Sequence, residues 1–101
     1  MKLRTIAHSR AGDKGHIVNL SVIAFDERDY DRIVRNVTVD RVRTHFAGLI
    51  EGDVVRYELP ALGALNFVLA RPPKETVTRT LALDAHGKSL SALLLDLDIP
   101  E

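Results

Sequence analysis

Apolar residues recur along this chain at spacings that predict both strands and helices. Residues 17–25 are almost continuously apolar and β-branched, which is typical of a central strand buried on both faces. In the other expected strands apolar and polar positions alternate, so that one face is buried. These strands, the first of them weakly patterned, are expected at residues 2–7, 53–59, 64–70 and 76–83. Turns are predicted at 60–63, 71–75 and 84–88.

Helical spacing and capping residues predict three helices. Tyr30, Ile33, Val34 and Val37 fall on one helical face. Thr38 then predicts the N-cap of a second helix, and Gly48 its left-handed C-terminal residue. At the end of the chain, Leu90, Leu93, Leu94 and Leu97 also have helical spacing, with Ser89 as N-cap. Alternation from Leu93 to Ile99 would suit a strand as well, but we favour the helix.

The expected order of elements, β-β-α-α-β-β-β-α, predicts an α+β fold. Helices segregated against a mainly antiparallel sheet make a two-layer sandwich with the helices on one face. The 101 residues form one domain, because 46% hydrophobic and 28% charged residues are ordinary globular composition. The Leu-rich C-terminal segment is expected in the core. Apolar surface that this small fold leaves over would be covered by a second copy of the chain.

Charge and composition exclude several classes of function. Fourteen basic and fourteen acidic residues cancel, and the few aromatic residues do not interleave with a basic patch, so nucleic-acid binding is not expected. The absence of cysteine excludes disulfides, thiolate catalysis and Cys-ligated zinc. No apolar segment reaches the length of a signal-peptide core or a membrane span, so we expect a cytoplasmic protein.

The segment Ala7–His16 has the densest candidate chemistry. We interpret it as a loop between two strands, in which Gly12 and Gly15 would let backbone N–H groups converge on an anion. Arg10 would hold a carboxylate or phosphate bidentately and Lys14 would add charge. Alternatively, Asp13 pairs with Arg10 or Lys14 and the loop is simply solvated. Neither a Walker loop nor a dinucleotide-binding fingerprint is present.

Several segments resemble the AtuA-like ferredoxin-fold domain, a family found as the C-terminal part of acyclic terpene utilisation AtuA-type proteins or as a free-standing protein. The resemblance covers nearly the whole chain and rests on His8–Gly15, Asn19, His45-Phe46, Arg56–Pro60, Ala64–Leu69 and Leu83–Lys88. It implies a ferredoxin-like α+β fold and a role in terpenoid-acid or acyl-CoA catabolism. Two departures are His16, where the family usually has Asp, and the turn Arg71–Glu75, where a Gly-rich turn is usual.

Three functions are compatible with this resemblance. The leading hypothesis is an accessory binding domain of an AtuA-like system, which takes a small anionic metabolite or an AtuA-type partner protein. The second is a lyase or hydratase acting on an acyl-CoA or a small organic acid, in which Lys14 or His16 would move the proton and Arg10 would hold the acid. The third is a purely structural subunit of a partner enzyme.

The candidate ligand-binding residues are drawn from the opening segment and from two strands that asparagine interrupts. They are Ser9, Arg10, Gly12, Asp13, Lys14, Gly15, Asn19 and Asn66. Structural explanations compete with this one: an amide would satisfy nearby backbone, and Arg79, on the apolar side of its strand, would pair with Glu58. No cofactor is expected. The four histidines lack metal-ligand spacing, so His8, Asp13 and His16 are only a remote candidate for a metal site.

Overall fold

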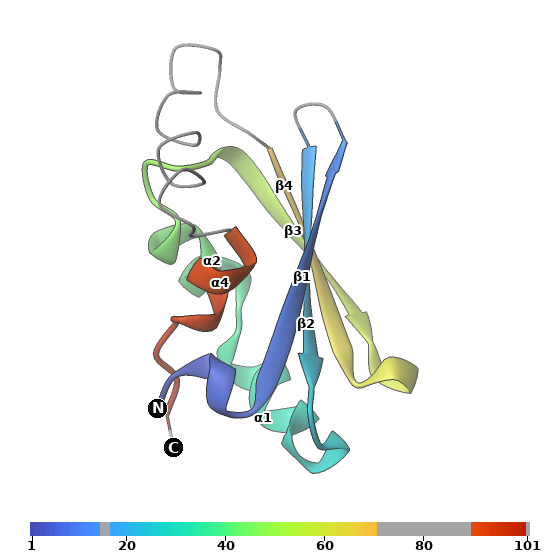
Figure 1. Cartoon of the computed structure of the whole chain (residues 1–101). Helices are drawn as coiled ribbons and strands as arrows, with labels where there is room; N and C mark the ends of the chain where they lie inside the picture. Colours follow the sequence, from blue (N-terminus) through green and yellow to red (C-terminus); the bar gives the residue numbers. More distant parts are fainter. Residues whose placement is uncertain (15–16, 71–89, 101) are drawn as a thin grey trace.

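A four-stranded antiparallel sheet with the order β1-β2-β4-β3 organises the chain (Figure 1). The computed structural model describes residues 1–14, 17–70 and 90–100. The strands are β1 (Ala7–Lys14), β2 (Ile17–Ala24), β3 (Glu51–Leu59) and β4 (Ala64–Ala70). The helices are α1 (Tyr30–Asn36), α2 (Val39–His45) and α4 (Leu90–Leu95), with short 3-10 helices η1 (Leu3–Thr5), η2 (Glu27–Asp29) and η3 (Pro60–Leu62). The α+β prediction, with a mainly antiparallel sheet, is confirmed.

The opening segment is a strand, so its interpretation as a loop is wrong. Residues Ala7–Lys14 pair antiparallel with Ile17–Ala24 in an unbroken register from Ala7↔Ala24 to Lys14↔Ile17. The physical reason is that a polar segment beside a central strand satisfies its backbone N–H and C=O groups best in the ladder. The strand expected at 2–7 is also wrong. It is replaced by η1, where Leu3 is fully buried and its N–H donates to the Leu97 carbonyl at 2.8 Å.

Strand β2 occupies the centre of the sheet, as its apolar sequence predicts. Its burial alternates, however: Val18, Leu20 and Val22 are buried, whereas Ile17 remains 39% exposed. The expectation of a strand buried on both faces is therefore wrong. In the described structure the helices cover one face of the sheet, and the other face lies open.

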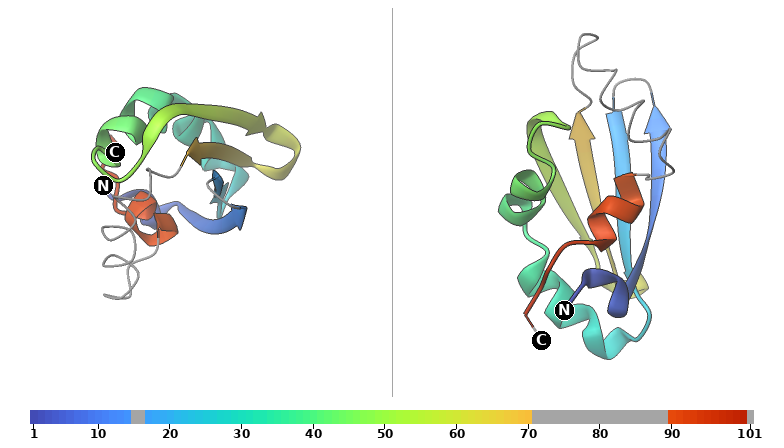
Figure 2. Two further views of the ribbon diagram at one scale, coloured as in Figure 1. Left: turned by 90° about the horizontal axis from the view of Figure 1, so that it is seen from above. Right: turned by 60° about the vertical axis from the view of Figure 1, so that its left-hand side comes forward.

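The helices gather on one side of the sheet (Figure 2). Ile33 and Val37 of the first predicted helical face are fully buried. The Thr38 hydroxyl accepts a hydrogen bond from the Arg41 N–H at 3.2 Å, which confirms the predicted N-cap of α2. Gly48, just after α2, has a φ of 86°, a left-handed conformation that glycine adopts at little cost.

Strands β3 and β4 form the other half of the sheet. In β4, Leu65, Phe67 and Leu69 point into the core, as their alternation predicts. The connection is η3 followed by Gly63, whose φ of 60° completes the predicted turn. In β3 the apolar side, Val55, Tyr57 and Leu59, faces away from the helices and is 42%, 53% and 40% exposed.

Arg56 is a charged residue on the helix-facing side of β3, next to buried Val54 on that side. Its guanidinium donates to the carbonyls of Val34 at 2.7 Å and Val37 at 3.1 Å, which lie at the C-terminal end of α1. It also donates to Glu58 at 3.0 Å, so Glu58 has an ion-pair partner within its own strand. A cation at this position stabilises the negative end of the α1 dipole. Arg56 thus fastens α1 to the sheet edge.

The C-terminal segment packs beside the N-terminus, so the two ends lie side by side (Figure 1). Leu90 and Leu94 of α4 are buried, as are Leu97 and Ile99 beyond it, which confirms the helix and its place in the core. The Ile99 N–H donates to the Met1 carbonyl at 2.8 Å. The expected strand at 76–83 with Arg79, the turns at 71–75 and 84–88, and the Ser89 N-cap lie outside the described residues.

Candidate functional site

The face of the sheet opposite the helices, here called the open face, gathers most of the described candidate residues. The strand registers place on it the positions that alternate with the core-facing ones. Its members are His8, Arg10 and Gly12 of β1, Ile17, Asn19, Ser21 and Ile23 of β2, Val55, Tyr57 and Leu59 of β3, and Ala64, Asn66, Val68 and Ala70 of β4.

A row of polar side chains crosses the open face at right angles to the strands. Arg10 pairs in register with Ser21, Ser21 with Asn66, and Asn66 with Tyr57. Neighbouring strands are about 4.8 Å apart, so the row extends over about 14 Å from Arg10 to Tyr57. It therefore presents a guanidinium, an amide and a phenol to one surface.

Arg10 is exposed, and its backbone is held in place. The Ser21 hydroxyl accepts from the Arg10 N–H at 3.1 Å and donates to the Arg10 carbonyl at 3.3 Å. Among the side chains that the structure describes, which do not include that of Asp13, none forms a hydrogen bond or an ion pair with the Arg10 guanidinium. This group carries five N–H donors, a set that suits a carboxylate or phosphate.

Asn19 and Asn66 meet next to this row. The Asn66 Nδ2 donates to the Asn19 Oδ1 at 3.4 Å, across the β2–β4 boundary. Both side chains are half-buried, and the second amide hydrogen of Asn66 and the amide group of Asn19 are left for a ligand. The structure therefore brings Arg10, Asn19 and Asn66 to one surface, although 47 residues separate the two asparagines.

Of the other candidates, some lie on one of the two faces of the sheet and some lie outside the described residues. Ser9 pairs with buried Val22 on the helix side, and its buried hydroxyl has no hydrogen-bond partner among the described residues. Gly12 pairs with Asn19 and is not among the glycines of positive φ, so the nest expected at Gly12 is wrong. The backbones of Asp13 and Lys14 pair with Val18 and Ile17. Gly15 and His16 lie outside the described residues.

Sequence reasoning missed Tyr57 and Ser21. Both would have been found by laying the strands in register and asking which residues flank Arg10 and Asn66. That register depends on pairing between distant strands, which the local pattern does not encode.

The histidines have structural partners. The rings of His8 and Phe25 stack with centroids 5.4 Å apart and an interplanar angle of 14° at one end of the open face. His45 Nε2 donates to the Leu93 carbonyl at 2.6 Å and so joins α2 to α4. Within residues 1–14, 17–70 and 90–100, no three His, Asp or Glu side chains come together to hold a metal ion.

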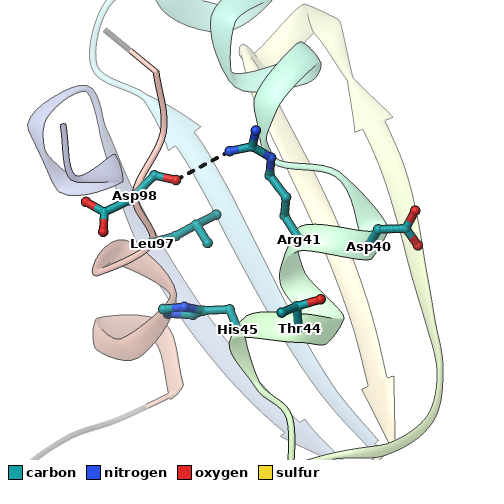
Figure 3. Close-up of a pocket in the computed structure, with 6 residues that line it drawn as sticks. All are labelled: Asp40, Arg41, Thr44, His45, Leu97 and Asp98. Atoms are coloured by element: carbon teal, nitrogen blue, oxygen red, sulfur yellow. Dashed lines mark hydrogen bonds between the residues drawn. The ribbon is translucent and has the colours of Figure 1, made fainter.

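A groove of about 380 Å³ lies on the helix side, between α2 and the segment after α4 (Figure 3). It is lined by Asp40, Arg41, Thr44, His45, Leu97 and Asp98. Arg41 is engaged with the Asp98 carbonyl at 3.5 Å, and the carboxylates of Asp40 and Asp98 point in opposite directions, away from the groove (Figure 3). Its polar groups do not converge, so the open face is the better candidate site.

Comparison with known proteins agrees with this architecture. The family model of the AtuA ferredoxin-like domain matches residues 1–100. The chain belongs to this family. No curated protein and no solved structure matches it. Among the described residues of this AtuA ferredoxin-like domain, no helix has the length and apolar character needed to cross a membrane.

The residues that carry the family resemblance fall into two groups, one that stabilises the fold and one that lies on the open face. Phe46, His45 and Arg56 hold the AtuA ferredoxin-like domain together: Phe46 is fully buried, and the other two bind carbonyls of neighbouring elements. Arg10, Asn19 and Asn66 lie on the open face and have no comparable structural task. The second group is therefore the candidate for ligand recognition.

Proposed function

We propose that this AtuA ferredoxin-like domain is an accessory binding module of a metabolic system, and that its open face recognises a small organic acid. The observation that carries the proposal is the polar row that begins at Arg10, with Asn66 in the middle and Asn19 beside it. Arg10 supplies the charge, and the two amides supply directional hydrogen bonds. A carboxylate is the anion that this set suits best, because a guanidinium binds its two oxygens in parallel.

The surroundings of the row suit a ligand with a hydrocarbon chain. Ile23 and Leu59 lie on one side of the row, and Val55 and Val68 on the other. A branched aliphatic acid would place its carboxylate at Arg10 and its hydrocarbon part over one of these apolar flanks, where burial of apolar surface is favourable. This arrangement supports terpenoid acids or their acyl-CoA thioesters, the ligand class that the family resemblance implies.

The test is thermal stabilisation of the purified domain by three probes: a free branched acid such as citronellate, its coenzyme A thioester, and inorganic phosphate. A probe at 100 times its Kd stabilises the folded state by about 2.7 kcal/mol. For a domain of this size each kcal/mol raises Tm by about 4–8 °C. We expect the acid or its thioester to raise Tm, and Arg10→Ala to remove the effect.

Arg43→Ala is the matched control, because Arg43 is an exposed arginine on α2, on the opposite side of the sheet. Stabilisation that survives in Arg10→Ala, or that is lost equally in Arg43→Ala, would contradict a site on the open face. Turnover of the thioester that disappears in Lys14→Ala would favour the enzymatic alternative instead. No response to any probe, together with co-purification of an AtuA-type protein, would favour a structural subunit.

A further inference from the structure

We propose that the open face is also the contact surface of a symmetric homodimer, in which β1 of one copy lies over β3 of the other. The first argument is the inverted pattern of β3. An edge strand of an isolated sandwich directs its apolar residues to the core and its polar residues to water. Here Val55, Tyr57 and Leu59 point outward, whereas buried Val54 is followed on the helix side by the charged residues Arg56 and Glu58. The apolar side of β3 therefore has no cover within the described part of the chain.

The size of the open face is the second argument. Four strands about 4.8 Å apart, each about eight residues long at about 3.4 Å per residue, give a flat area of about 500 Å² per copy. Two such faces together reach about 1,000 Å², the lower limit for a specific interface, before the relief of the side chains is added. Exposed Phe25, at the end of the face beside His8, extends it further.

The third argument is that the face is complementary to itself. A two-fold axis parallel to the strands, between β2 and β4, places β1 of one copy over β3 of the other. Each cross-strand row then lies over the same row of the second copy. The polar row then meets a polar row, and in the flanking rows Leu59 and Val55 of β3 lie over His8 and Gly12 of β1 in the other copy. The three rows are Arg10–Ser21–Asn66–Tyr57, His8–Ile23–Ala64–Leu59 and Gly12–Asn19–Val68–Val55.

Charge selects this axis over the alternative. Arg10 is on β1, whereas the outward side of β3 presents Tyr57. With β1 over β3, each Arg10 guanidinium faces the ring of the partner's Tyr57, a favourable cation–π contact. An axis at right angles to the strands would bring β1 over β1 and the two Arg10 charges toward each other, which is unfavourable. A second copy in the first orientation is therefore the occupant that the face fits.

Sedimentation equilibrium of the full chain over a hundredfold range of concentration tests the dimer. We expect a dimer in which Val55→Asp raises the dissociation constant at least tenfold, because it places a carboxylate in the apolar flank. Thr44→Asp adds the same charge at an exposed position of α2 and leaves the dissociation constant unchanged. A wild-type chain that stays monomeric, or a dimer that Val55→Asp does not weaken, overturns the proposal.

Cross-linking tests the orientation independently of stability. The chain has no cysteine, so single engineered cysteines react only where they are placed. Facing sheets lie about 10 Å apart, a gap that a short bis-maleimide spans. We expect a mixture of Arg10→Cys and Tyr57→Cys to give covalent dimers, and each variant alone to give few. Efficient cross-linking of Arg10→Cys with itself would overturn the orientation with β1 over β3. The second copy would cover Arg10 and Asn66, so it and the acid would compete for the open face. Neither experiment uses a ligand, so the dimer and the proposed acid site are tested separately.

Discussion

The side-chain amide nitrogen of Asn66 lies 3.4 Å from the amide oxygen of Asn19, on the open side of two central strands. Each asparagine lies in a largely apolar strand, and neither points into the core. Their pairing uses one donor and one acceptor and leaves the others at the surface beside Arg10. The two amides are therefore suited to orient a polar ligand group.

Substitution Asn66→Asp is expected to abolish stabilisation of the domain by citronellate or its thioester. A carboxylate beside the acid group of the ligand repels it and removes the amide donor. The fold itself should lose less than about 1 kcal/mol, because the position is half-buried on the open face. Thermal shift with and without the probe measures the first effect, and urea unfolding without the probe measures the second. Equal stabilisation of Asn66→Asp and wild type would count against the amide pair as a recognition element.

Substitution Arg56→Ala is expected to lower the free energy of unfolding by about 2–4 kcal/mol. The guanidinium, only 19% exposed, makes charged hydrogen bonds to the Val34 and Val37 carbonyls, which would lose their partner. Urea unfolding followed by circular dichroism measures the loss.

Glu58→Gln separates these carbonyl contacts from the ion pair of Arg56. Glu58 is exposed, and its pairing with Arg56 at 3.0 Å should contribute less than about 1 kcal/mol. If Glu58→Gln destabilised the domain as much as Arg56→Ala, the capping of α1 would not be the main role of Arg56.

Tyr30 should make the stability of the domain depend on alkaline pH. Burial raises the pKa of the Tyr30 phenol above its ordinary value, with a further contribution from the nearby Glu58 charge. Because the folded pKa is the higher one, the contribution of Tyr30 is complete below pH of about 10 and is lost as the pH rises through the folded pKa.

Tyr30→Phe removes this titration and should reduce the alkaline loss of stability. It should cost about 1 kcal/mol or less below pH of about 10, because the ring is retained and the phenol loses a single hydrogen-bonding contact, with the Leu59 backbone. The chain has two tyrosines, so ultraviolet titration of the variant records Tyr57 alone, and the difference from wild type is Tyr30. A Tyr30 phenol that ionises below its ordinary pKa would contradict the prediction.

Substitution His45→Ala is expected to lower the free energy of unfolding by about 1–3 kcal/mol. The 2.6 Å hydrogen bond from His45 Nε2 holds the Leu93 carbonyl of α4, and its loss leaves a partly buried acceptor unsatisfied. Amide hydrogen exchange should show faster opening of α4 in this variant. Thr44→Ala, next to it and exposed, should change stability by less than about 0.5 kcal/mol. Unchanged exchange in α4 would contradict the coupling of the two helices.

Local pattern predicts the elements of this domain well where a short range has a clear periodicity, a capping residue or a turn residue. The helical face from Tyr30 to Val37, the Thr38 cap, the turn ending at Gly63 and the alternation in β4 are all present in the structure. Each depends on contacts within a few residues, which are encoded next to one another in the chain.

The prediction for the opening segment was wrong because it also relied on local composition. Its polar and glycine-rich composition is typical of a loop, but the backbone ladder with β2 makes it a strand. The composition nevertheless located half of the candidate site, because Arg10 remained on the surface. Asn19 and Asn66 were also named from the sequence, whereas their meeting depended on the β2–β4 register.

The amino-acid sequence by itself determined the α+β class, most of the elements and the family, because periodicity, capping residues and ordered motifs are all local or linear properties. Only the tertiary structure decided which side of each strand meets the helices. Strand register is set by long-range pairing, and shifting it by one residue exchanges the two faces. That choice turned Val55, Tyr57 and Leu59 outward, brought Arg10 into one row with Asn66, and so created the open face.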